Sequence, residues 1–425
     1  MSQDDIIASA GAGYVRAGGA LVCDRVSLEA AAAEYGTPLY LYSRAAIEAA
    51  YAAYARAFAA VPHRICYAVK ANGNGAILRL MAGLGAGADI VSGGELLAAL
   101  RAGFPPERIV FAGVGKTDAE LALGLERGIG EWNVESEAEV ERLAATATAR
   151  GTRARVSLRV NPDIDPRSHP YISTGLREAK FGVDIAAAAA ILGRARERAG
   201  IEVVGVQCHI GSQIVETEPL AAAARALAGL SRQLLDEGFA LRTLDVGGGL
   251  GVSYDGSDVP DATRLASAVL PAIEGLPLTL VLEPGRSLVA AAGVLLTRVL
   301  YVKQGQARRF VVVDAGMNDL LRPALYQAFH RVEPVRSRGR EPELVDIVGP
   351  VCETSDFLAR RRELERVEPG ELLAVRDAGA YAFSMSSNYN MRPRAAEVMI
   401  EDGRARLVRR RETFEDLVRT EVEGR

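Results

Sequence analysis

The stretch ICYAVKAN, residues 65–72, ends an apolar, β-prone run in a single lysine, Lys70, at the point where a strand should give way to a helix. A lysine at the tip of a buried strand suits imine chemistry. Desolvation lowers an amine pKa toward neutrality, and the free amine condenses with an aldehyde. The alternative is an ordinary surface lysine at a strand end. The choice between them depends on which other residues converge on Lys70.

The length and composition are those of a globular protein. The chain has 425 residues, 49% hydrophobic and 24% charged, enough to bury a large core in one or two domains. Its net charge is -4 with both signs interspersed, so no basic stripe predicts binding to nucleic acid or to a membrane surface. The acidic start, MSQDD, differs from a signal peptide, and no stretch has the length of a membrane span. We therefore expect a cytoplasmic protein with small-molecule partners.

The cysteines and histidines are scattered along the chain. The four cysteines, at 23, 66, 208 and 352, include no CxxC pair, so neither a disulfide framework nor a zinc knuckle is predicted. The four histidines, at 63, 169, 209 and 330, lack the i,i+4 spacing of two ligands on one helix face. We predict no metal site.

Between about residues 64 and 285, short β-prone runs alternate with Ala- and Leu-rich helical stretches, which is typical of βα units around a parallel sheet. There are about eight such runs, the number that closes a (β/α)₈ barrel. The expected strands are residues 65–70, 88–92, 108–112, 131–134, 156–160, 203–210, 244–247 and 278–283.

After residue 285 the pattern changes to β-branched strands without long helices, as in RFVVVD (309–314) and ELLAV (371–375). We therefore expect an α/β protein, a TIM-like barrel over residues 39–288 followed by a mostly β domain over residues 289–425. Residues 1–38 precede the barrel and should pack with the β domain. LVC (21–23) and TPLYLY (37–42) could add a strand to it, which chain order alone does not prove.

In such barrels the carboxyl ends of the strands carry the chemistry, and polar or glycine residues gather there in this chain. A glycine run after a late strand lets backbone N–H groups approach a phosphate closely. The run is GGGLG and no helix start follows it, so it does not match the dinucleotide pattern GxGxxG; a tight turn is the alternative. The strand ends carry, in order, Lys70, Asp89 with SGGE (92–95), Arg159, HIGSQ (209–213), GGGLG (247–251) and EPGR (283–286).

A lysine for an imine, glycines for a phosphate, a histidine ring and a glutamate at one rim together describe a pyridoxal phosphate pocket. Glu283 beside the pyridine nitrogen would keep that nitrogen protonated, since a charge pair about 4 Å apart at an effective dielectric near ~20 is worth roughly 4 kcal/mol. The protonated ring can hold the electrons left when a bond at the substrate α-carbon breaks. His209 fits stacking on the ring better than metal binding, and a satisfied core histidine is the alternative.

Several motifs together resemble the fold type III pyridoxal phosphate decarboxylases: YAVKAN (67–72), HIGSQ, the glycine run and EPGR. Three further segments resemble the diaminopimelate decarboxylases among them: MNDLLRPALY (317–326), GPVCETSD (349–356) and residues 379–393, which begin GAY. The resemblance covers nearly the whole chain. It implies a homodimer with shared active sites.

The resemblance also implies residue roles. Lys70 would form the Schiff base with the cofactor, the internal aldimine; His209 would stack on its ring, and Glu283 would pair with its nitrogen. Cys352, from the partner subunit, would protonate the carbanion; a buried small apolar residue is the alternative for this cysteine. The further cofactor contacts that we expect are Asp89, Arg159, Ser212, Gly247, Gly248, Gly249, Gly285, Arg286 and Tyr381.

The implied reaction is decarboxylation of meso-2,6-diaminopimelate to L-lysine and carbon dioxide, the final step of lysine biosynthesis. This substrate has an amine and a carboxylate at each end, so its distal end needs both a cation and an anion. Arg286, Arg322 and Glu353 fit those needs, and Tyr326 and Tyr381 would add hydroxyls. The similar ornithine decarboxylases carry aspartate where this chain has Glu353, which disfavours ornithine. A surface salt bridge is the alternative for Arg322.

Two other functions stay open. One is a decarboxylase of the same group that acts on a different basic amino acid, and the other is a catalytically silent cofactor-binding relative. The joint presence of Lys70, Cys352 and Glu283 argues against silence. The polar segment 163–180, after the fifth strand, has the length of a lid, and we expect it to close over bound substrate.

Overall fold

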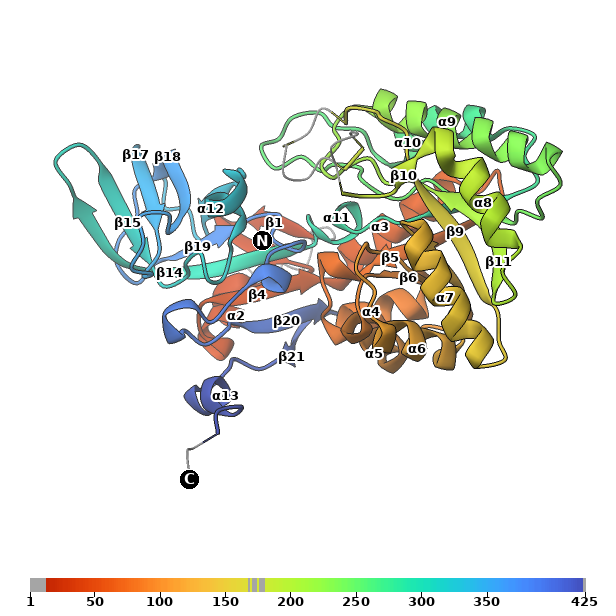
Figure 1. Cartoon of the computed structure of the whole chain (residues 1–425). Helices are drawn as coiled ribbons and strands as arrows, with labels where there is room; N and C mark the ends of the chain where they lie inside the picture. Colours follow the sequence, from red (N-terminus) through yellow and green to blue (C-terminus); the bar gives the residue numbers. More distant parts are fainter. Residues whose placement is uncertain (1–12, 167–168, 170–173, 176–179, 423–425) are drawn as a thin grey trace. The chain divides into compact units, whose positions relative to one another are not determined.

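The computed structural model describes residues 13–166, 169, 174–175 and 180–422 (Figure 1). The chain forms two compact units. The barrel unit comprises residues 50–252 and 258–287, and the β unit comprises residues 1–49, 253–257 and 288–425. Among the described residues, every helix is too short or too polar to cross a membrane.

The barrel unit is built around a closed parallel sheet of eight strands, which confirms the predicted (β/α)₈ barrel. The strands follow the order β9-β11-β12-β13-β5-β6-β7-β8, and the sheet closes because β8 also pairs with β9. A short strand, β10 (Val183–Asp184), pairs with β9 in addition. The eight strands are β5 (His63–Ala68), β6 (Gly87–Ile90), β7 (Ile109–Phe111), β8 (Glu131–Val134), β9 (Ala154–Asn161), β11 (Ile201–Gln207), β12 (Thr243–Asp245) and β13 (Thr279–Leu282).

Several strands end earlier than the sequence predicts. We expected residues 65–70, 203–210 and 244–247 to be extended, whereas these strands stop at Ala68, Gln207 and Asp245. After β5, for example, the backbone leaves the ladder in a single helical turn, Val69–Ala71. Lys70, His209 and the glycine run therefore lie beyond the strands, whereas Asp89 and Arg159 lie within β6 and β9.

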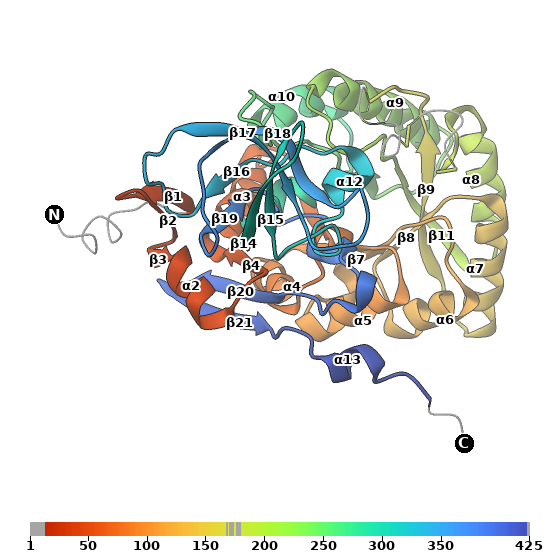
Figure 2. The same cartoon turned by 90° about the vertical axis from the view of Figure 1, so that its left-hand side faces the viewer.

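Helices surround the barrel, as Figure 2 shows. Their starts are set by side-chain caps: Thr117 and Glu120 form a capping box at α6, and Ser92 accepts from the Glu95 N–H at α5. Glycines in the left-handed conformation, Gly103 and Gly128, end these two helices. The helices are α4 (Gly75–Gly83), α5 (Gly93–Ala102), α6 (Asp118–Arg127), α7 (Glu137–Ala149), α8 (Ala188–Arg196), α9 (Thr217–Asp236) and α10 (Ala262–Ile273).

The amino end of the barrel interior holds a buried ion pair. Arg64 Nη2 lies 2.9 Å from Glu131 Oε2, and Glu131 Oε1 accepts from the hydroxyls of Thr243, at 2.9 Å, and Ser157. A buried charge is tolerated when it is paired and hydrogen-bonded in this way. This cluster closes the end of the barrel that lies opposite Lys70.

The β unit contains a large sheet with the strand order β18-β17-β15-β14-β4-β20-β21, to which β19 and β16 are added through β14. A separate three-stranded sheet has the order β1-β2-β3. The strands are β1 (Tyr14–Ala17), β2 (Ala20–Cys23), β3 (Val26–Ser27), β4 (Leu39–Ser43), β14 (Gly293–Gln304), β15 (Arg309–Val313), β16 (Val332–Pro334), β17 (Pro342–Val348), β18 (Phe357–Glu365), β19 (Leu372–Val375), β20 (Ala396–Glu401) and β21 (Arg404–Arg409).

An early segment of the chain completes this sheet. Strand β4 pairs antiparallel with β14 and parallel with β20. We expected the barrel to begin at residue 39, but β4 belongs to the β unit, and the units change within α3 (Arg44–Ala57). The buried side chains of β4, Leu39 and Leu41, pack in one core with Val294 and Val398. The burial of these two leucine side chains in the core of the β unit therefore explains why β4 belongs to this sheet.

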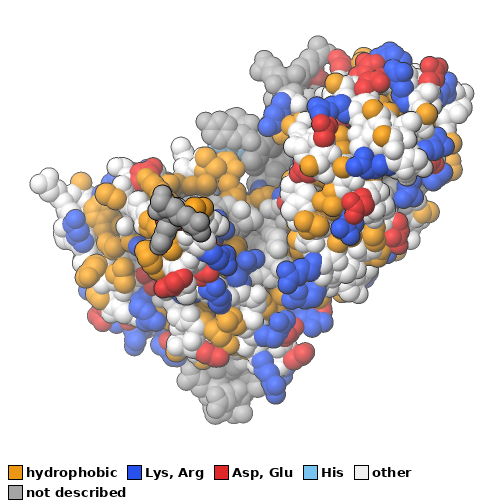
Figure 3. All heavy atoms as spheres, turned by 60° about the horizontal axis from the view of Figure 1, so that its bottom comes forward, with side chains coloured by type: hydrophobic (Ala, Val, Ile, Leu, Met, Phe, Trp, Pro, Cys, Tyr) orange, Lys and Arg blue, Asp and Glu red, His pale blue; other side chains and the backbone are white. Residues whose placement is uncertain are grey.

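The surface agrees with the mixed charge of the sequence. On the face shown in Figure 3, basic and acidic side chains are interspersed. Around the barrel, Arg194 pairs with Glu137 at 2.5 Å and Arg198 with Glu141 at 2.6 Å. Exposed ion pairs of this kind contribute little to stability. Because each arginine lies beside a glutamate, these pairs do not create a uniform basic field on this surface.

Candidate active site

Lys70 lies in a single helical turn, Val69–Ala71, directly after β5. Its Nζ is 2.5 Å from Asp89 Oδ2 at the end of β6. Asp89 is fully buried, whereas 35% of the Lys70 side chain is exposed. Within the described part of the chain, Asp89 Oδ1 has no hydrogen-bond partner. A donor from a bound group would satisfy this buried acceptor.

Glu283 follows β13 and is held by two amides that the sequence analysis missed. Asn133 Nδ2 donates to its Oε1 at 3.2 Å, and Gln207 Nε2 donates to its Oε2 at 3.1 Å. Burial, with the nearby carboxyls of Asp245 and Asp89, raises the pKa of Glu283 well above its ordinary value. A cationic ring nitrogen beside Glu283 would reverse that shift and make the carboxylate the favoured form.

The glycine run packs tightly against the neighbouring strand ends. A Cβ on Gly248 would lie 2.2 Å from the Glu283 carbonyl oxygen, and one on Gly249 would lie 2.4 Å from that of Gly211. The Gly247 and Gly248 N–H groups already donate within the protein, to Asp245 Oδ1 at 2.8 Å and to His209 Nδ1 at 3.2 Å. The glycines thus allow close backbone approach, and two of their N–H groups orient side chains.

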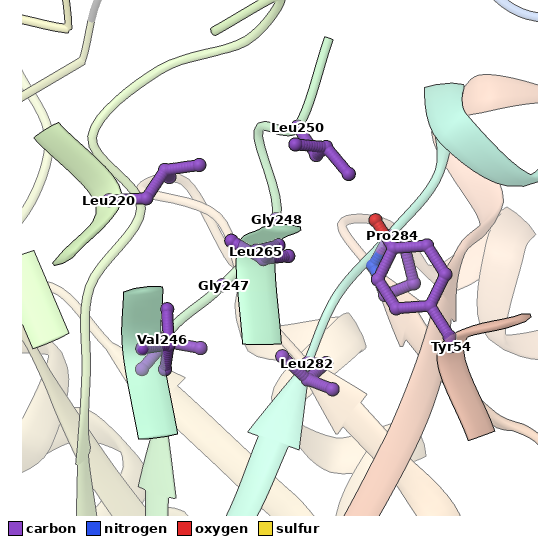
Figure 4. A pocket seen from close by; sticks show the side chains of 10 residues that line it. Tyr54, Leu220, Val246, Gly247, Gly248, Leu250, Leu265, Leu282 and Pro284 are labelled. Carbon is purple, nitrogen blue, oxygen red and sulfur yellow. The ribbon is translucent and has the colours of Figure 1, made fainter. Parts of the chain in front are cut away.

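Figure 4 shows the glycine run in the wall of a small, mostly apolar pocket. Tyr54 lies on one side of it, and its hydroxyl is 2.7 Å from Ser287 Oγ. The pocket is lined by Tyr54, Leu220, Val246, Gly247, Gly248, Leu250, Leu265, Val269, Leu282 and Pro284. These apolar side chains support the back of the loop.

His209 follows β11 and is fixed in one tautomer. Because the Gly248 N–H donates to its Nδ1, the neutral ring carries its proton on Nε2. Burial, with the Arg159 and Lys70 cations, lowers its pKa well below the ordinary value. The ring is therefore neutral at physiological pH, which suits stacking on an aromatic ligand.

A cation and a hydroxyl meet at the rim next to the glycines. Arg286 Nη2 donates to Ser212 Oγ at 2.9 Å, and Arg286 is 7% exposed. A Cβ on Gly285 would lie 3.0 Å from the Cβ atoms of Ala68 and Ala71, so this turn packs against the Lys70 turn. A guanidinium beside a hydroxyl suits a phosphate.

Arg159 is neutralised by a protein partner. Its Nη1 is 2.8 Å from Glu135 Oε1, its Nη2 donates to the His209 carbonyl oxygen at 3.4 Å, and its guanidinium lies over the Phe181 ring. These contacts show Arg159 supporting the turn that carries His209. Its expected contact with the cofactor stays a prediction.

In the β unit, Cys352 is exposed on a loop with a defined shape. Asp356 closes this loop by accepting from the N–H groups of Met317, at 2.6 Å, and Val351, at 2.5 Å. The Cys352 N–H donates to Asn390 Oδ1 at 3.0 Å. Because Cys352 is exposed, the alternative of a buried apolar residue is wrong.

Glu353, next to it, is also exposed and accepts from the Ser355 hydroxyl. This bond, together with one from the Tyr389 hydroxyl, lowers the pKa of Glu353. Glu353 is therefore an anion at neutral pH, as an ammonium-binding group must be.

Arg322 is only 5% exposed, so the alternative of a surface salt bridge is wrong. Its Nη1 lies 2.7 Å from His330 Nε2, and its guanidinium lies over the Tyr254 ring, 4.5 Å from the centroid. Tyr326 belongs to the same short helix, α12 (Arg322–Tyr326). Tyr381 has a φ of 53° and follows Gly379, where a Cβ would clash with the Val289 carbonyl oxygen.

The structure thus brings most expected cofactor residues together at the carboxyl end of one barrel. Cys352, Glu353, Arg322, Tyr326 and Tyr381 belong to the β unit. Much of the expected lid, segment 163–180, lies outside the described residues. Asn133, Gln207 and Asp245 were missed, and the only signal for them was a polar residue inside an otherwise buried strand.

Comparisons with known proteins identify the family of this chain. Residues 44–290 match the family described as "Pyridoxal-dependent decarboxylase, pyridoxal binding domain". Diaminopimelate decarboxylase of Pseudomonas aeruginosa is 53% identical over 397 residues, which cover 93% of this chain and 95% of that protein. The enzyme of the same name from Aquifex aeolicus is 48% identical over 401 residues, 94% of this chain and 95% of that protein.

Comparison with solved structures also finds similarity to diaminopimelate decarboxylases. Diaminopimelate decarboxylase from Helicobacter pylori, complexed with L-lysine, matches with a TM-score of 0.90 at 45% identity, covering 92% of this chain and 98% of that one. The fold and the matched domain define a pyridoxal-dependent decarboxylase, and pyridoxal phosphate is its cofactor. The partly exposed Lys70 side chain and the Arg286–Ser212 pair fit that group. So does Asp89 Oδ1, for which the described residues supply no donor. The chain belongs to the diaminopimelate decarboxylase family.

Proposed function

We propose that this protein converts meso-2,6-diaminopimelate to L-lysine and carbon dioxide, the last step of lysine biosynthesis. The observation that carries the proposal is the pairing of Lys70 with a buried Asp89 at the rim where two amides hold Glu283. The names of the relatives support the choice of substrate.

The cofactor, when bound, supplies an electron sink for the bond that breaks at the substrate α-carbon. Lys70 would attach it covalently through Nζ, and Asp89 would accept a hydrogen bond beside that nitrogen. Glu283 would hold a proton at the ring nitrogen, His209 would offer a flat neutral ring, and Arg286 with Ser212 would bind the phosphate. Arg159, the glycine run and Tyr381 complete the proposed cofactor contacts.

Cys352 is the proposed proton donor to the α-carbon, in the active site of the partner subunit of a homodimer. An exposed thiol on a loop fixed by Asp356 supports this role, because a donor must be both accessible and positioned. Tyr389 and Met391, which flank the Asn390 contact of Cys352, are 45% and 54% exposed. Exposed apolar side chains around a functional thiol support a subunit contact here.

The distal end of the substrate needs charges of both signs. We assign its ammonium to Glu353 and its carboxylate to Arg322 and Arg286, with hydroxyls from Tyr326 and Tyr381. Arg322 is held by His330 and Tyr254, so little conformational freedom is lost on binding. A structure of the Helicobacter pylori relative with L-lysine supports a site for a basic amino acid. A cytoplasmic location stays a prediction.

The substrate assignment is tested by measuring carbon dioxide release from four amino acids by the purified holoenzyme. We expect kcat/KM for meso-diaminopimelate to exceed that for ornithine, arginine and lysine by at least about 100-fold. The other three amino acids would leave an arginine or glutamate side chain of the protein without its partner at the distal end of the substrate, which lowers their kcat/KM. A higher value for ornithine would identify the alternative decarboxylase. No release from any of the four, with cofactor bound, would identify the silent relative.

A further inference from the structure

A second carboxyl stands beside Glu283 in the barrel interior. Asp245 ends β12 and is fully buried, and its carboxyl raises the pKa of the neighbouring Glu283 carboxyl. Asn133 Nδ2 bridges the two, 3.4 Å from Asp245 Oδ2 and 3.2 Å from Glu283 Oε1. None of the roles proposed above uses Asp245.

Because both buried carboxyls lie within hydrogen-bond reach of the same amide nitrogen, Asn133 Nδ2, ionising both at once is disfavoured and one proton is shared between them. Burial raises the pKa of Asp245 to about 7, and the neighbouring Glu131 and Asp89 carboxyls add to the shift. The charged and titratable groups that face the pair are Asp89, Glu131, Lys70, Arg64, Cys66 and Cys208. The two cations among them already pair with Asp89 and Glu131.

The hydrogen bonds indicate which carboxyl keeps the proton when a cationic ring nitrogen meets Glu283. Both Glu283 oxygens receive amide N–H groups, which favours the ionised form. Asp245 Oδ1 receives the Gly247 N–H at 2.8 Å, whereas among the described residues the one N–H group that Oδ2 receives is that of Asn133, at 3.4 Å. Oδ2 is therefore the oxygen best placed to carry the proton and to donate it in a hydrogen bond to Glu283.

We propose that Asp245 is a positioning residue that, as a neutral acid, donates a hydrogen bond through Oδ2 to the Glu283 carboxylate. It keeps that carboxylate anionic and aimed at the cofactor ring nitrogen. By accepting the Gly247 N–H, Asp245 also connects Glu283 with the glycine run. The inference rests on the proposed role of Glu283.

The test is an NMR titration of holoenzyme made with isotope-labelled pyridoxal phosphate. It measures the midpoint, which is the pH at which half of the cofactor ring nitrogens are protonated. Asp245→Asn places a neutral group of the same shape at this position, so the midpoint should stay within about 0.3 pH units of the wild-type value. An ionised Asp245 would predict the opposite, because losing an anion beside a pyridinium lowers the midpoint by about one unit or more. That fall in Asp245→Asn overturns the proposal.

Asp245→Ala removes the donor and should lower the midpoint by at least about one unit, a tenfold loss of proton affinity at the ring nitrogen. If Asp245 served only to hold Gly247, Asp245→Ala would weaken cofactor affinity but leave the midpoint in place, which also overturns the proposal. The thermal midpoint of each cofactor-free variant checks folding, and Asp245→Asn decides alone if Asp245→Ala does not fold.

The variant Glu283→Gln distinguishes a failure of the proposed role of Asp245 from a failure of the proposed role of Glu283. It should abolish ring protonation at neutral pH. If Glu283→Gln leaves the ring protonated, the role of Glu283 fails and the inference fails with it. If Glu283→Gln loses the proton while Asp245→Ala keeps it, only the role of Asp245 fails.

Discussion

Lys70→Ala should eliminate covalent cofactor attachment and reduce decarboxylation by more than about 1,000-fold, because it removes the amine that Asp89 holds at the end of β6. The closest described contact of Nζ is Asp89, a fully buried carboxylate, so the amine is already positioned before the cofactor arrives. The measurement is borohydride reduction of the holoenzyme followed by peptide mass spectrometry. The wild-type peptide that contains Lys70 should carry the reduced cofactor, and the variant peptide should not.

Loss of the cation beside Asp89 could by itself disturb the site, so Lys70→Arg serves as the matched control. It keeps a positive charge near Asp89 but offers no amine for attachment. We expect Lys70→Arg to unfold at the wild-type temperature and still to lack the labelled peptide. Lys303→Ala, which removes an exposed lysine of β14, should behave like the wild type in both measurements. Label on a different lysine in the wild-type protein would contradict the assignment.

Cys352→Ala should retain the bound cofactor and its absorbance while turnover falls by roughly 100- to 10,000-fold, the usual contribution of a positioned general acid. The thiol is exposed, and Asp356 fixes the loop that carries it. Steady-state kinetics with meso-diaminopimelate, together with the cofactor spectrum, measure both effects. Full activity in this variant would remove Cys352 from the mechanism.

The other three cysteines make a chemical control possible. Cys23, Cys66 and Cys208 are buried, and burial raises the pKa of their thiols, so a thiol alkylating reagent should modify Cys352 first. Modification should inactivate the wild type and leave the residual activity of Cys352→Ala unchanged. Thr354→Ala, an exposed neighbour on the same loop, should keep wild-type activity and wild-type sensitivity to the reagent.

The proposed homodimer provides a further check on Cys352. If the thiol serves the partner's site, mixing inactive Lys70→Ala and Cys352→Ala subunits should restore activity, since a mixed dimer contains one site with both residues intact. One active site in a mixed dimer limits the recovery to about a quarter of the wild-type activity in an equal, random mixture. No recovery after verified subunit exchange would place Cys352 in the site of its own subunit.

The barrel and its polar rim could be predicted from the sequence because both follow from local patterns. Each strand is a short apolar run, and parallel strands in a barrel must bring their carboxyl ends together. Lys70, Asp89, His209 and Glu283 are therefore neighbours although the chain separates them. Their exact conformations were less accessible: the sequence placed Lys70 within a strand, whereas it lies in the turn after it.

The supporting residues could not be predicted because their contacts depend on barrel closure and register. Asn133, Gln207 and Asp245 stand on three different strands, and each resembles an isolated polar residue in an apolar run. Only the folded barrel shows that they surround Glu283. For β4 the sequence indicated the right sheet, because TPLYLY (37–42) was considered as a strand of the β domain, but the expected start of the barrel at residue 39 was wrong.

The most direct test of the account is formation of L-lysine from meso-diaminopimelate by the purified protein, after its cofactor has been removed and after pyridoxal phosphate has been restored. We predict lysine and carbon dioxide in equal amounts with the cofactor restored, and neither product without it. Equal activity in the absence of cofactor, or no lysine from the fully reconstituted protein, would contradict the account.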